Sequence, residues 1–568
     1  MTVVVAPTAF AGQRSADRQQ MMVVAHSRLM ILMLLFAAAV LAIVLRLAFF
    51  AISVAPAEAR NLADSLIPVR ADITDRRGEA LARTIDAWSI GVHPGKVIGD
   101  KDDLARRLAE LMPDRDADWY LARLNDRRGY AYLRRRAMPE LVQAVNALGE
   151  PGIVMAREPE RLYPQGTVAA HVLGYVGTDG HGLSGMERAI DDRLVQPAMR
   201  GTPVALSIDL RVQAAFESEL ASAMTDLQAA GAAGVVLDVH TGEVMAMASL
   251  PTFNPNRVLP GDREAMRNNV VQSNYELGST FKPLTAALAI DTGVVRSMSQ
   301  RWDATRPLQV GRFPIRDDHP LRRWLNLPEM LVHSSNIVTA RIADNLGAER
   351  MQGMFRQLGF AAPPAIEIRE KGSTLWQGYW PRITTMTTGY GHGIAVTPLH
   401  LASAYAAMVN GGIWRPATML RVAPGRAAPG RRVFSETTSA RMNQLLRLIV
   451  LEGTGRNADA PGFRVGGKTG TAERPQNGGY SRNRNVSTFA AAFPMDAPRY
   501  VVIAMLDSPV ANARSRGQAT AGWTAAPVVG RTVQRIGPLL GVIPETDRDI
   551  DVADVRAMLS RDAGEPVE

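Results

Sequence analysis

The sequence predicts an α+β protein: a single N-terminal transmembrane helix, an extended α/β region, and an antiparallel sheet packed with helices. Three observations predict this class. Residues 29–52 are almost continuously apolar, residues 234–248 carry a hairpin signal, and residues 277–291 and 397–410 have the pattern of helices. A chain of 568 residues is long enough for two or three domains, each with its own core.

The apolar run predicts one membrane anchor. Every residue from Leu29 to Leu45 is apolar, and the run resumes after Arg46 and continues to Ile52. This length crosses a bilayer as a helix. Three arginines precede the run, so the positive-inside rule places residues 1–28 in the cytoplasm and the rest of the chain outside the inner membrane. A cleaved signal peptide is the alternative, because residues 55–59 resemble a small-residue cleavage site, but the run is longer than a usual signal sequence.

Beyond the anchor, the composition changes near Gly231. Residues 61–224 mix short β-like runs with charged helical stretches at 104–111 and 139–148, and we identify no catalytic constellation there. Two apolar runs, 234–239 and 244–248, then flank the turn residues 240–243, and strands are expected again at 488–493 and 500–506. The predicted domains are therefore a cytoplasmic tail (1–28), an anchor (29–52), a non-catalytic domain (53–225), a catalytic domain (226–540) and a C-terminal tail (541–568).

Composition excludes several functional classes. The net charge of +9 and the pI near 9.9 would suit nucleic acid or an anionic membrane, but the basic residues form no run of five, so we predict no nucleic-acid binding. The chain has no cysteine, which removes disulfides, thiolate nucleophiles and cysteine metal sites. No metal and no cofactor is expected.

Lysine is rare in this chain. Only five of the 64 basic residues are lysines, at positions 96, 101, 282, 371 and 468. Arginine stays protonated near neutral pH, whereas a desolvated lysine can lose its proton. Lysines retained within motifs therefore indicate amine chemistry, and Lys282 and Lys468 both lie within motifs.

The first motif is Ser279-Thr280-Phe281-Lys282, at the start of a predicted helix. The i, i+3 spacing places Ser279 and Lys282 on one face, where a neutral amine can take the proton of the hydroxyl. Backbone N–H groups at the helix start can stabilise an oxyanion formed at the serine. Alone, the pattern also fits an ordinary N-cap serine followed by a surface lysine.

Two further motifs favour the catalytic interpretation. Ser334-Ser335-Asn336 supplies a hydroxyl and an amide at a turn or helix start, and Lys468-Thr469-Gly470-Thr471 supplies an amine, two hydroxyls and a glycine that permits close backbone approach. Penicillin-binding proteins and serine β-lactamases carry S-x-x-K, S-x-N and K-T-G in this order.

Two other patterns are weaker. Residues 462–469 satisfy the phosphate-loop pattern G-x-x-x-x-G-K-[ST], but the preceding segment is polar, and Pro475 with the following glycines interrupts any helix after it. His392, in a glycine-rich loop, is a candidate base for a histidine-driven triad, but a loop histidine bracketed by glycines is more often structural.

Residues 70–537 resemble a class B penicillin-binding protein of the division-specific, FtsI-like branch. The resemblance rests on the three motifs, on residues 70–76, 182–187 and 207–209, on the Tyr275–Gly278 segment before the nucleophile, on the His333–Ile337 form of the second motif, and on residues 396–399. The chain departs from the family at Leu277, where proline is usual, and at His400, where glutamine is usual. Both departures concern local backbone shape.

The resemblance implies a D,D-transpeptidase that cross-links peptidoglycan stem peptides and is blocked covalently by β-lactams. Ser279 would be the nucleophile and Lys282 its base. Ser334 would relay a proton to the leaving amine, Asn336 would hold Lys282 and the substrate amide, and Lys468 would supply positive potential. Thr469 and Thr471, with Gly470 between them, would bind the substrate carboxylate, and the backbone N–H groups of Ser279 and Thr471 would form the oxyanion hole.

The resemblance also implies partners and a location. Residues 53–225 would be the family's non-catalytic pedestal, of dimerisation type, and would contact the septal lipid II polymerase (FtsW-type) and other divisome membrane proteins. The catalytic domain would be periplasmic on a single-pass anchor in the inner membrane. Three alternatives remain: a β-lactamase-like hydrolase, a membrane-bound β-lactam sensor, and a divisome scaffold without activity.

Overall fold

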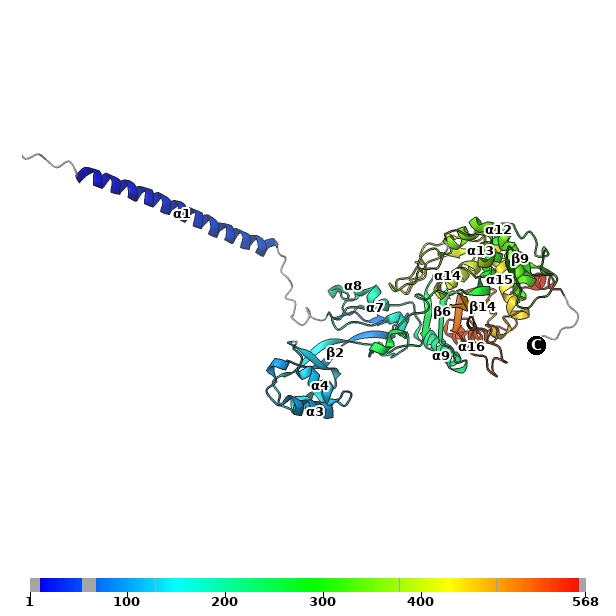
Figure 1. Ribbon diagram of the computed structural model, residues 1–568, viewed down its shortest axis with the longest axis horizontal. Coiled ribbons are helices and arrows are strands. Elements are labelled where there is room, and N and C mark those ends of the chain that lie inside the picture. Colours follow the sequence, from blue (N-terminus) through cyan, green and yellow to red (C-terminus); the bar gives the residue numbers. More distant parts are fainter. Residues whose placement is uncertain (1–10, 54–67, 128, 377, 477–478, 561–568) are drawn as a thin grey trace, which may run out of the picture. The chain divides into compact units, whose positions relative to one another are not determined.

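A computed structural model describes residues 11–53, 68–127, 129–376, 378–476 and 479–560 (Figure 1). The chain divides into two compact units, residues 1–66 and residues 67–568. The second unit combines two mixed helix-and-strand regions, one of them built on an antiparallel sheet. The predicted α+β class is therefore confirmed.

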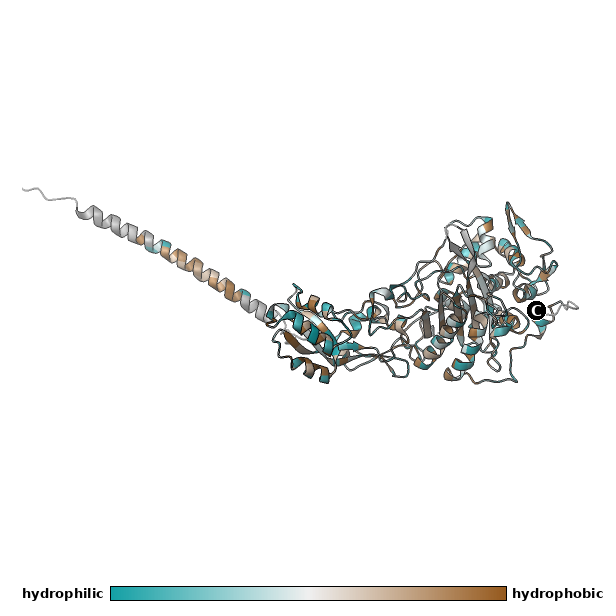
Figure 2. Cartoon of the chain, turned by 60° about the horizontal axis from the view of Figure 1, so that its bottom comes forward, coloured by the Kyte–Doolittle hydropathy of each residue, from teal (hydrophilic) through white to brown (hydrophobic). Residues whose placement is uncertain are grey.

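The described part of the first unit is one long helix, α1 (Ala11–Ser53). Within it, His26–Arg46 has a mean hydropathy of 2.8 and is long and apolar enough to cross a membrane. At 1.5 Å per residue this stretch is about 31 Å long, close to the thickness of the hydrocarbon core. Figure 2 shows the hydrophobic colouring along this stretch. The rival cleavage site at residues 55–59 lies outside the described residues.

The first region of the second unit is built on a sheet with strand order β3-β2-β1-β5, with β4 paired to the long strand β2. Residues 83–92 of β2 pair antiparallel with residues 153–162 of β4, and β1 and β5 are parallel. Helices α3, α4 and α5 enclose a small core with the far ends of these strands, and the side chains of Asp100 and Asp116 cap the starts of α3 and α4. The strands are β1 (Ile73–Thr74), β2 (Ala80–Val92), β3 (Ala131–Ala137), β4 (Ile153–Leu162) and β5 (Val204–Ala205); the helices are α3 (Lys101–Leu111), α4 (Ala117–Leu124), α5 (Pro139–Asn146), α6 (Ala170–Leu173), α7 (Gly185–Ala189) and α8 (Asp191–Leu194).

A buried ion network joins the segments of this region. Glu187 in α7 is fully buried and accepts from Arg70 Nε at 3.0 Å, from Arg70 Nη2 at 2.8 Å and from Arg161 Nε at 2.7 Å. Arg70 precedes β1 and Arg161 lies near the end of β4, so one carboxylate fixes three segments that are distant in sequence. The sequence alone did not predict this network.

The second region contains a five-stranded antiparallel sheet of order β14-β15-β16-β6-β7. The hairpin predicted from residues 234–248 is confirmed, and the strand predicted at 488–493 is longer than expected because its pairing with β14 extends back to Gly479. The strands are β6 (Gly231–Asp238), β7 (Val244–Leu250), β14 (Gly466–Gln476), β15 (Gly479–Phe493) and β16 (Tyr500–Asp507).

Helices cover both faces of this sheet (Figure 1). Val235 packs in one hydrophobic core with α14, and its neighbour Val236 packs in the other with α9 and α16, as the alternation of side chains along a strand requires. The helices are α9 (Leu210–Asp226), α10 (Lys282–Asp291), α11 (Leu327–Val332), α12 (Asn336–Gln357), α13 (Arg382–Thr388), α14 (Pro398–Val409), α15 (Glu436–Glu452), α16 (Ala525–Leu539) and α17 (Ala553–Arg556).

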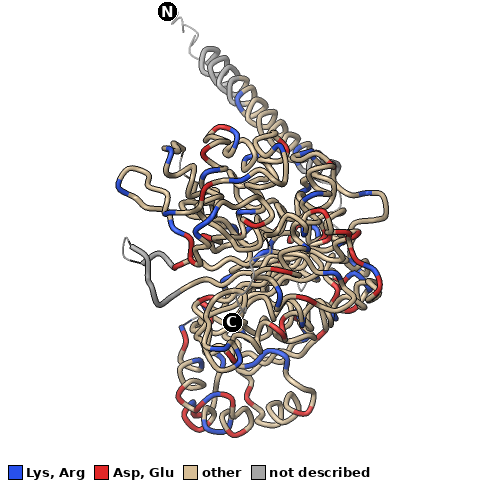
Figure 3. The backbone as a smooth tube through the Cα atoms, turned by 90° about the vertical axis from the view of Figure 1, so that its right-hand side faces the viewer, with Lys and Arg blue, Asp and Glu red and all other residues tan. Residues whose placement is uncertain are grey.

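Charged residues of both signs are interspersed along the chain (Figure 3). The predicted C-terminal tail contacts the catalytic region as far as residue 560: Val555 is fully buried, and the Ser560 N–H donates to Glu329 Oε1 at 3.1 Å. The phosphate-loop alternative fails, because Lys468 lies inside strand β14, which pairs directly with β15 and is followed by no helix.

We expect Glu187→Ala to destabilise the second unit by about 3–5 kcal/mol, because the buried Arg161 loses the carboxylate that it pairs with, while Arg70 loses one of its two acidic partners and keeps Asp191. Denaturant unfolding of the full chain in detergent, followed by tryptophan fluorescence, measures the change. Glu110→Ala, at an exposed position of α3, is the matched control. Equal unfolding midpoints for the two variants would show that the network is dispensable.

Candidate active site

Ser279 lies in a single 3₁₀ turn, η4 (Gly278–Phe281), and α10 follows directly from Lys282. We predicted one helix from Leu277, and the structure differs in this first turn. The Lys282 N–H bonds to the Ser279 carbonyl oxygen, three residues back. In a 3₁₀ turn the side chains at i and i+3 eclipse each other, which aligns Ser279 and Lys282 more closely than an α-helix does.

Three glycines bring separate segments against this turn. A Cβ at Gly391 would lie 2.1 Å from the Gly278 carbonyl oxygen, and a Cβ at Gly470 would lie 2.3 Å from the Leu277 carbonyl oxygen. Gly278 itself has φ of +53° and would meet the Thr471 carbonyl oxygen at 3.0 Å. Only glycine fits these contacts, so β14 and the 389–393 loop approach the nucleophile through their main chains. The glycine of the third motif thus accommodates the protein's own backbone.

Helix α14 fixes the main chain of the nucleophile turn through a hydrogen bond. The fully buried Tyr405 donates its hydroxyl to the Thr280 carbonyl oxygen at 2.8 Å, and Thr280 Oγ1 donates to the Leu277 carbonyl oxygen at 2.9 Å. Both bonds fix the main chain on either side of Ser279. Neither residue was identified from the sequence, because nothing in the spacing links Tyr405 to the first motif.

The departure at His400 has a physical explanation. Its Nδ1 accepts from the Thr397 N–H at 3.3 Å and lies 3.0 Å from Thr397 Oγ1, which completes a capping box at the start of α14. A glutamine at this position makes the same return bond in capping boxes generally. The other ring nitrogen, Nε2, lies 2.9 Å from the Ala362 carbonyl oxygen, and burial lowers the pKa of His400 to about 4. The neutral imidazole therefore replaces the amide.

The amine of Lys282 is buried at the centre of the site. Its Nζ donates to Ser334 Oγ at 3.0 Å and to the main-chain oxygen of Ser334. Burial lowers the pKa of Lys282 to about 7, against the smaller opposing effect of Asp317 and Asp318. A neutral Lys282 amine is therefore accessible near neutral pH. The structure thus brings the first and second motifs together.

The second motif begins a helix, as predicted. Ser335 caps α12 by accepting from the Val338 N–H at 3.2 Å and donates to Asp317 Oδ2 at 2.8 Å. Ser334 has φ of +60°, a strained conformation that points its carbonyl oxygen at Lys282. The Asn336 amide nitrogen donates to the Arg316 carbonyl oxygen at 3.0 Å. In this structure Asn336 therefore holds the loop that carries Asp317.

The third motif places a second buried amine beside the first. Lys468 Nζ donates to Thr469 Oγ1 at 3.0 Å and to the Thr469 carbonyl oxygen at 3.1 Å, and Thr469 Oγ1 lies 2.8 Å from Thr454 Oγ1. Burial, and then the charge of Lys282, hold the pKa of Lys468 well below its usual range. Because the two buried amines lie close together, a state in which both Lys282 and Lys468 are protonated is disfavoured. Thr471 Oγ1 accepts from the Ala521 N–H at 3.0 Å.

The strand that carries this motif is an edge strand. In the sheet order β14 has β15 on one side only, and its other edge faces the turn of Ser279. An edge strand presents N–H and C=O groups that an extended peptide can pair with. The site therefore combines a nucleophile, two amines and a backbone template for a peptide.

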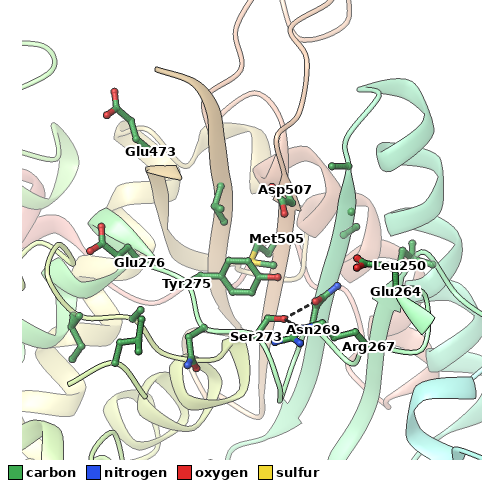
Figure 4. Close-up of a pocket in the computed structure, with 18 of the residues that line it drawn as sticks. Leu250, Glu264, Arg267, Asn269, Ser273, Tyr275, Glu276, Glu473, Met505 and Asp507 are labelled. Carbon is green, nitrogen blue, oxygen red and sulfur yellow. Dashed lines mark hydrogen bonds between the residues drawn. The ribbon is translucent and has the colours of Figure 1, made fainter. Parts of the chain in front are cut away.

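A cavity of about 1050 Å³ is lined by residues that flank two of the motifs and by none of the motif residues themselves (Figure 4). Glu276, three residues before Ser279, and Glu473, two residues after Thr471, both line it. Glu276 also accepts from the Gly393 N–H at 3.0 Å and lies 3.5 Å from His392 Nδ1. Glu276 thus fixes the position of His392 in the 389–393 loop. Among the described residues, no group of three His, Asp or Glu side chains could hold a metal ion.

Comparisons with known proteins agree with this geometry. Residues 232–531 match the penicillin binding protein transpeptidase domain, and residues 65–195 match the penicillin-binding protein dimerisation domain. The chain is 41% identical to a probable peptidoglycan D,D-transpeptidase FtsI of Caulobacter vibrioides, over 84% of this chain and 82% of that protein. It is 30% identical to peptidoglycan D,D-transpeptidase FtsI of Escherichia coli K12, over 84% of each chain.

Solved structures show the same similarity. Penicillin binding protein 3 of Mycobacterium tuberculosis, complexed with aztreonam, aligns with a TM-score of 0.66 and 26% identity, over 84% of this chain and 98% of that chain. The TP domain of Burkholderia pseudomallei penicillin-binding protein 3 aligns with a TM-score of 0.54 and 30% identity, over 60% of this chain and 97% of that one.

We expect Gly391→Ala to slow covalent labelling of Ser279 by fluorescent penicillin at least about tenfold, because the new methyl group forces the Gly278 main chain to move and misplaces the nucleophile. Gly393→Ala is the matched control: Gly393 also has positive φ, but its added Cβ would meet its nearest atom at 3.7 Å. Both variants carry similar backbone strain, so they separate strain from collision. Equal labelling rates in the two folded variants would contradict the role of the contact.

Proposed function

This chain belongs to the class B penicillin-binding proteins of the FtsI-like branch, and on that premise we propose that it cross-links peptidoglycan stem peptides during septal wall synthesis with Ser279 as its nucleophile. As a serine-type D,D-transpeptidase it takes an acyl group from one stem peptide and passes it to another. The proposed site residues are Ser279, Lys282, Ser334, Asn336, Lys468, Thr469, Gly470 and Thr471.

The burial of the Lys282 amine supports this proposal most strongly. A neutral amine has two N–H donors and one lone pair. Ser334 offers an acceptor for each donor, its Oγ at 3.0 Å and its main-chain oxygen. The lone pair is then available to the Ser279 hydroxyl one 3₁₀ turn away. A pKa of about 7 matches the operating pH of a general base.

In the acylation half-reaction, Ser279 Oγ attacks the carbonyl carbon of the penultimate D-Ala as its proton passes to Lys282. The oxyanion is stabilised by the backbone N–H groups of Ser279 and Thr471. The C–N bond then breaks, and the proton travels from Lys282 through Ser334 Oγ to the departing D-Ala amine. The 3.0 Å contact between Lys282 Nζ and Ser334 Oγ supports this relay.

The second half-reaction reverses these steps with a different amine. An amine of the acceptor stem peptide loses a proton along the same relay and attacks the Ser279 ester, which forms the cross-link and restores the serine. The donor peptide lies as an added strand along β14, and its carboxylate meets the hydroxyls of Thr469 and Thr471. Burial holds the pKa of Lys468 well below its usual range, so Lys468 acts there as a neutral hydrogen-bond donor and not as the expected source of positive potential. Asn336 acts on the substrate amide after it leaves the Arg316 carbonyl oxygen.

The rest of the chain positions this reaction outside the membrane. We propose that α1 is retained as a single-pass anchor with its N-terminus in the cytoplasm and the catalytic domain in the periplasm. The pedestal, residues 53–225, would contact the septal lipid II polymerase and other divisome membrane proteins. The β-lactamase, sensor and scaffold alternatives are not favoured, because the relatives named transpeptidases match across both the pedestal and the catalytic regions.

We expect penicillin to label Ser279 stoichiometrically, and Lys282→Arg to reduce the second-order acylation rate about 10²–10⁴-fold, because a guanidinium keeps its proton and cannot act as the base. Peptide mapping locates the adduct, and stopped-flow labelling gives the rate. Lys96→Arg, at an exposed pedestal position, is the matched control. A folded Lys282→Arg variant that acylates within about threefold of wild type would assign the base to another group.

We also expect the acylation rate to depend on pH through Lys282. Below a pKa of about 7 the amine is protonated and cannot accept the serine proton, so the rate falls as pH decreases and reaches a plateau above pH 7. The residual rate of Lys282→Arg should lack this inflection. A wild-type rate that stays constant from about pH 5.5 to 8 would contradict a base that titrates near 7.

A further inference from the structure

A second large cavity lies in the pedestal, away from the catalytic motifs. This cleft has a volume of about 1080 Å³, and its walls carry eight arginines but only three carboxylates, Asp114, Glu160 and Asp179. Arg70 and Arg161 belong to the buried Glu187 network. The other six define what we call the arginine cleft: Arg115, Arg123, Arg134, Arg135, Arg136 and Arg257. The lining therefore carries an excess of positive charge.

The backbone is distorted at this position. Arg134, Arg135 and Arg136 are consecutive residues of β3, and all three line the cleft. Side chains alternate between the two faces of a regular strand, so three consecutive residues line the same cavity only where the strand is irregular. Arg136 supplies this irregularity, because its φ of +56° is a left-handed conformation that is strained for arginine. Backbone strain of this kind is concentrated at functional positions.

Aromatic rings hold the guanidinium groups in place. Arg115 and Arg123 lie 5.3 Å and 4.9 Å from the centre of the Trp119 ring, and Arg135 lies 4.9 Å from the centre of the Tyr132 ring. Stacking on a ring orders the arginine and leaves its N–H edge available for hydrogen bonds. The cleft is therefore preorganised to bind oxyanions with little further loss of side-chain entropy.

Two of the lining carboxylates are already paired with lining arginines: Asp114 with Arg134, and Glu160 with Arg135 and Arg136. Glu160 lies 3.2 Å from Arg135 Nε and 3.0 Å from Arg136 Nη2, so two arginines share one carboxylate. Within the described part of the chain, the buried Nη2 of Arg161 has no hydrogen-bond partner although Arg161 is 4% exposed and lines the cleft. Such an unpaired buried donor is costly unless an acceptor reaches it.

We propose that the arginine cleft binds the carboxylate-bearing stem peptides of an uncross-linked glycan strand, at a site separate from Ser279. This inference rests on the proposed function, which makes that polymer the substrate. The lining arginines come from separate segments, from Arg115 just before α4 to Arg257 in the loop after β7, and the positive charge therefore fits an anion with several separated carboxylates better than a single phosphate. Binding here retains the polymer while Ser279 processes its peptides one after another.

The test uses the full-length chain in detergent with Ser279 already acylated by penicillin, so that the catalytic site is closed. Fluorescence anisotropy measures the binding of labelled, soluble, uncross-linked peptidoglycan strands. The doubly charge-reversed variant Arg123→Glu/Arg257→Glu is expected to bind at least about tenfold more weakly, since opposite charges become like charges. Arg107→Glu, on the exposed face of α3 in the same region, is the matched control and should bind as wild type does.

Four results would overturn the proposal. The first two are an unchanged affinity in the double variant and a loss of affinity in the Arg107→Glu control as large as that in the double variant. The other two are that glycan strands stripped of their stem peptides bind as tightly as intact strands, or that inorganic pyrophosphate, phosphatidylglycerol vesicles or poly-glutamate compete as well as unlabelled intact strands. Wild type and the double variant should acylate with penicillin at the same rate, because this small substrate does not need the cleft. A failure of acylation in wild type would instead refute the proposed function, so the two failures are distinguishable.

Discussion

The burial of the Lys282 amine is the constraint on which the rest of the catalytic site depends. Burial lowers its pKa to about 7, and a buried amine must still satisfy its N–H groups. Ser334 satisfies two of them from a left-handed conformation, and that conformation is held between the end of α11 and the capped start of α12. Asp317 links this cap to the electrostatics of the site, because it binds Ser335 and also favours the charged form of Lys282. The packing and hydrogen bonds on either side of Ser334 thus hold its strained backbone conformation in place.

Arginine and lysine have separate tasks in this chain. Buried arginines are structural cations: Arg70 and Arg161 surround Glu187, and Arg447 bridges Asp459 and Asp549. The two fully buried lysines both lie in the catalytic site. This division follows from chemistry, because a guanidinium holds its proton in any environment found in proteins, whereas burial can deprotonate an ammonium. The same division makes a strongly basic protein compatible with a site that needs neutral amines.

The sequence was sufficient for the elements and motifs that depend on local pattern. The hairpin of β6 and β7, helix α14 and the start of α12 follow from periodicity and capping residues, and the three motifs follow from spacing. The 3₁₀ turn at Ser279, the contribution of Asp317 and the hydroxyl of Tyr405 were not predicted, because each depends on segments more than 30 residues apart in sequence. The glycine of the third motif was expected to face a substrate, but its closest neighbour is the carbonyl oxygen of Leu277. Sequence indicates that a position must lack a side chain, and only the fold shows which atoms require it.

The close main-chain contacts made at Gly278, Gly391 and Gly470 also limit how this protein can diverge. Because main-chain atoms meet directly, no rotamer change can absorb a larger residue at these positions. Each of the three codons therefore tolerates no missense change without movement of the nucleophile. Adaptation to a new inhibitor must instead use side chains at the rim, such as those of the cavity beside Glu276 and Glu473, where substitution leaves the main chain in place. Evolutionary freedom at this site thus increases with distance from the glycine contact.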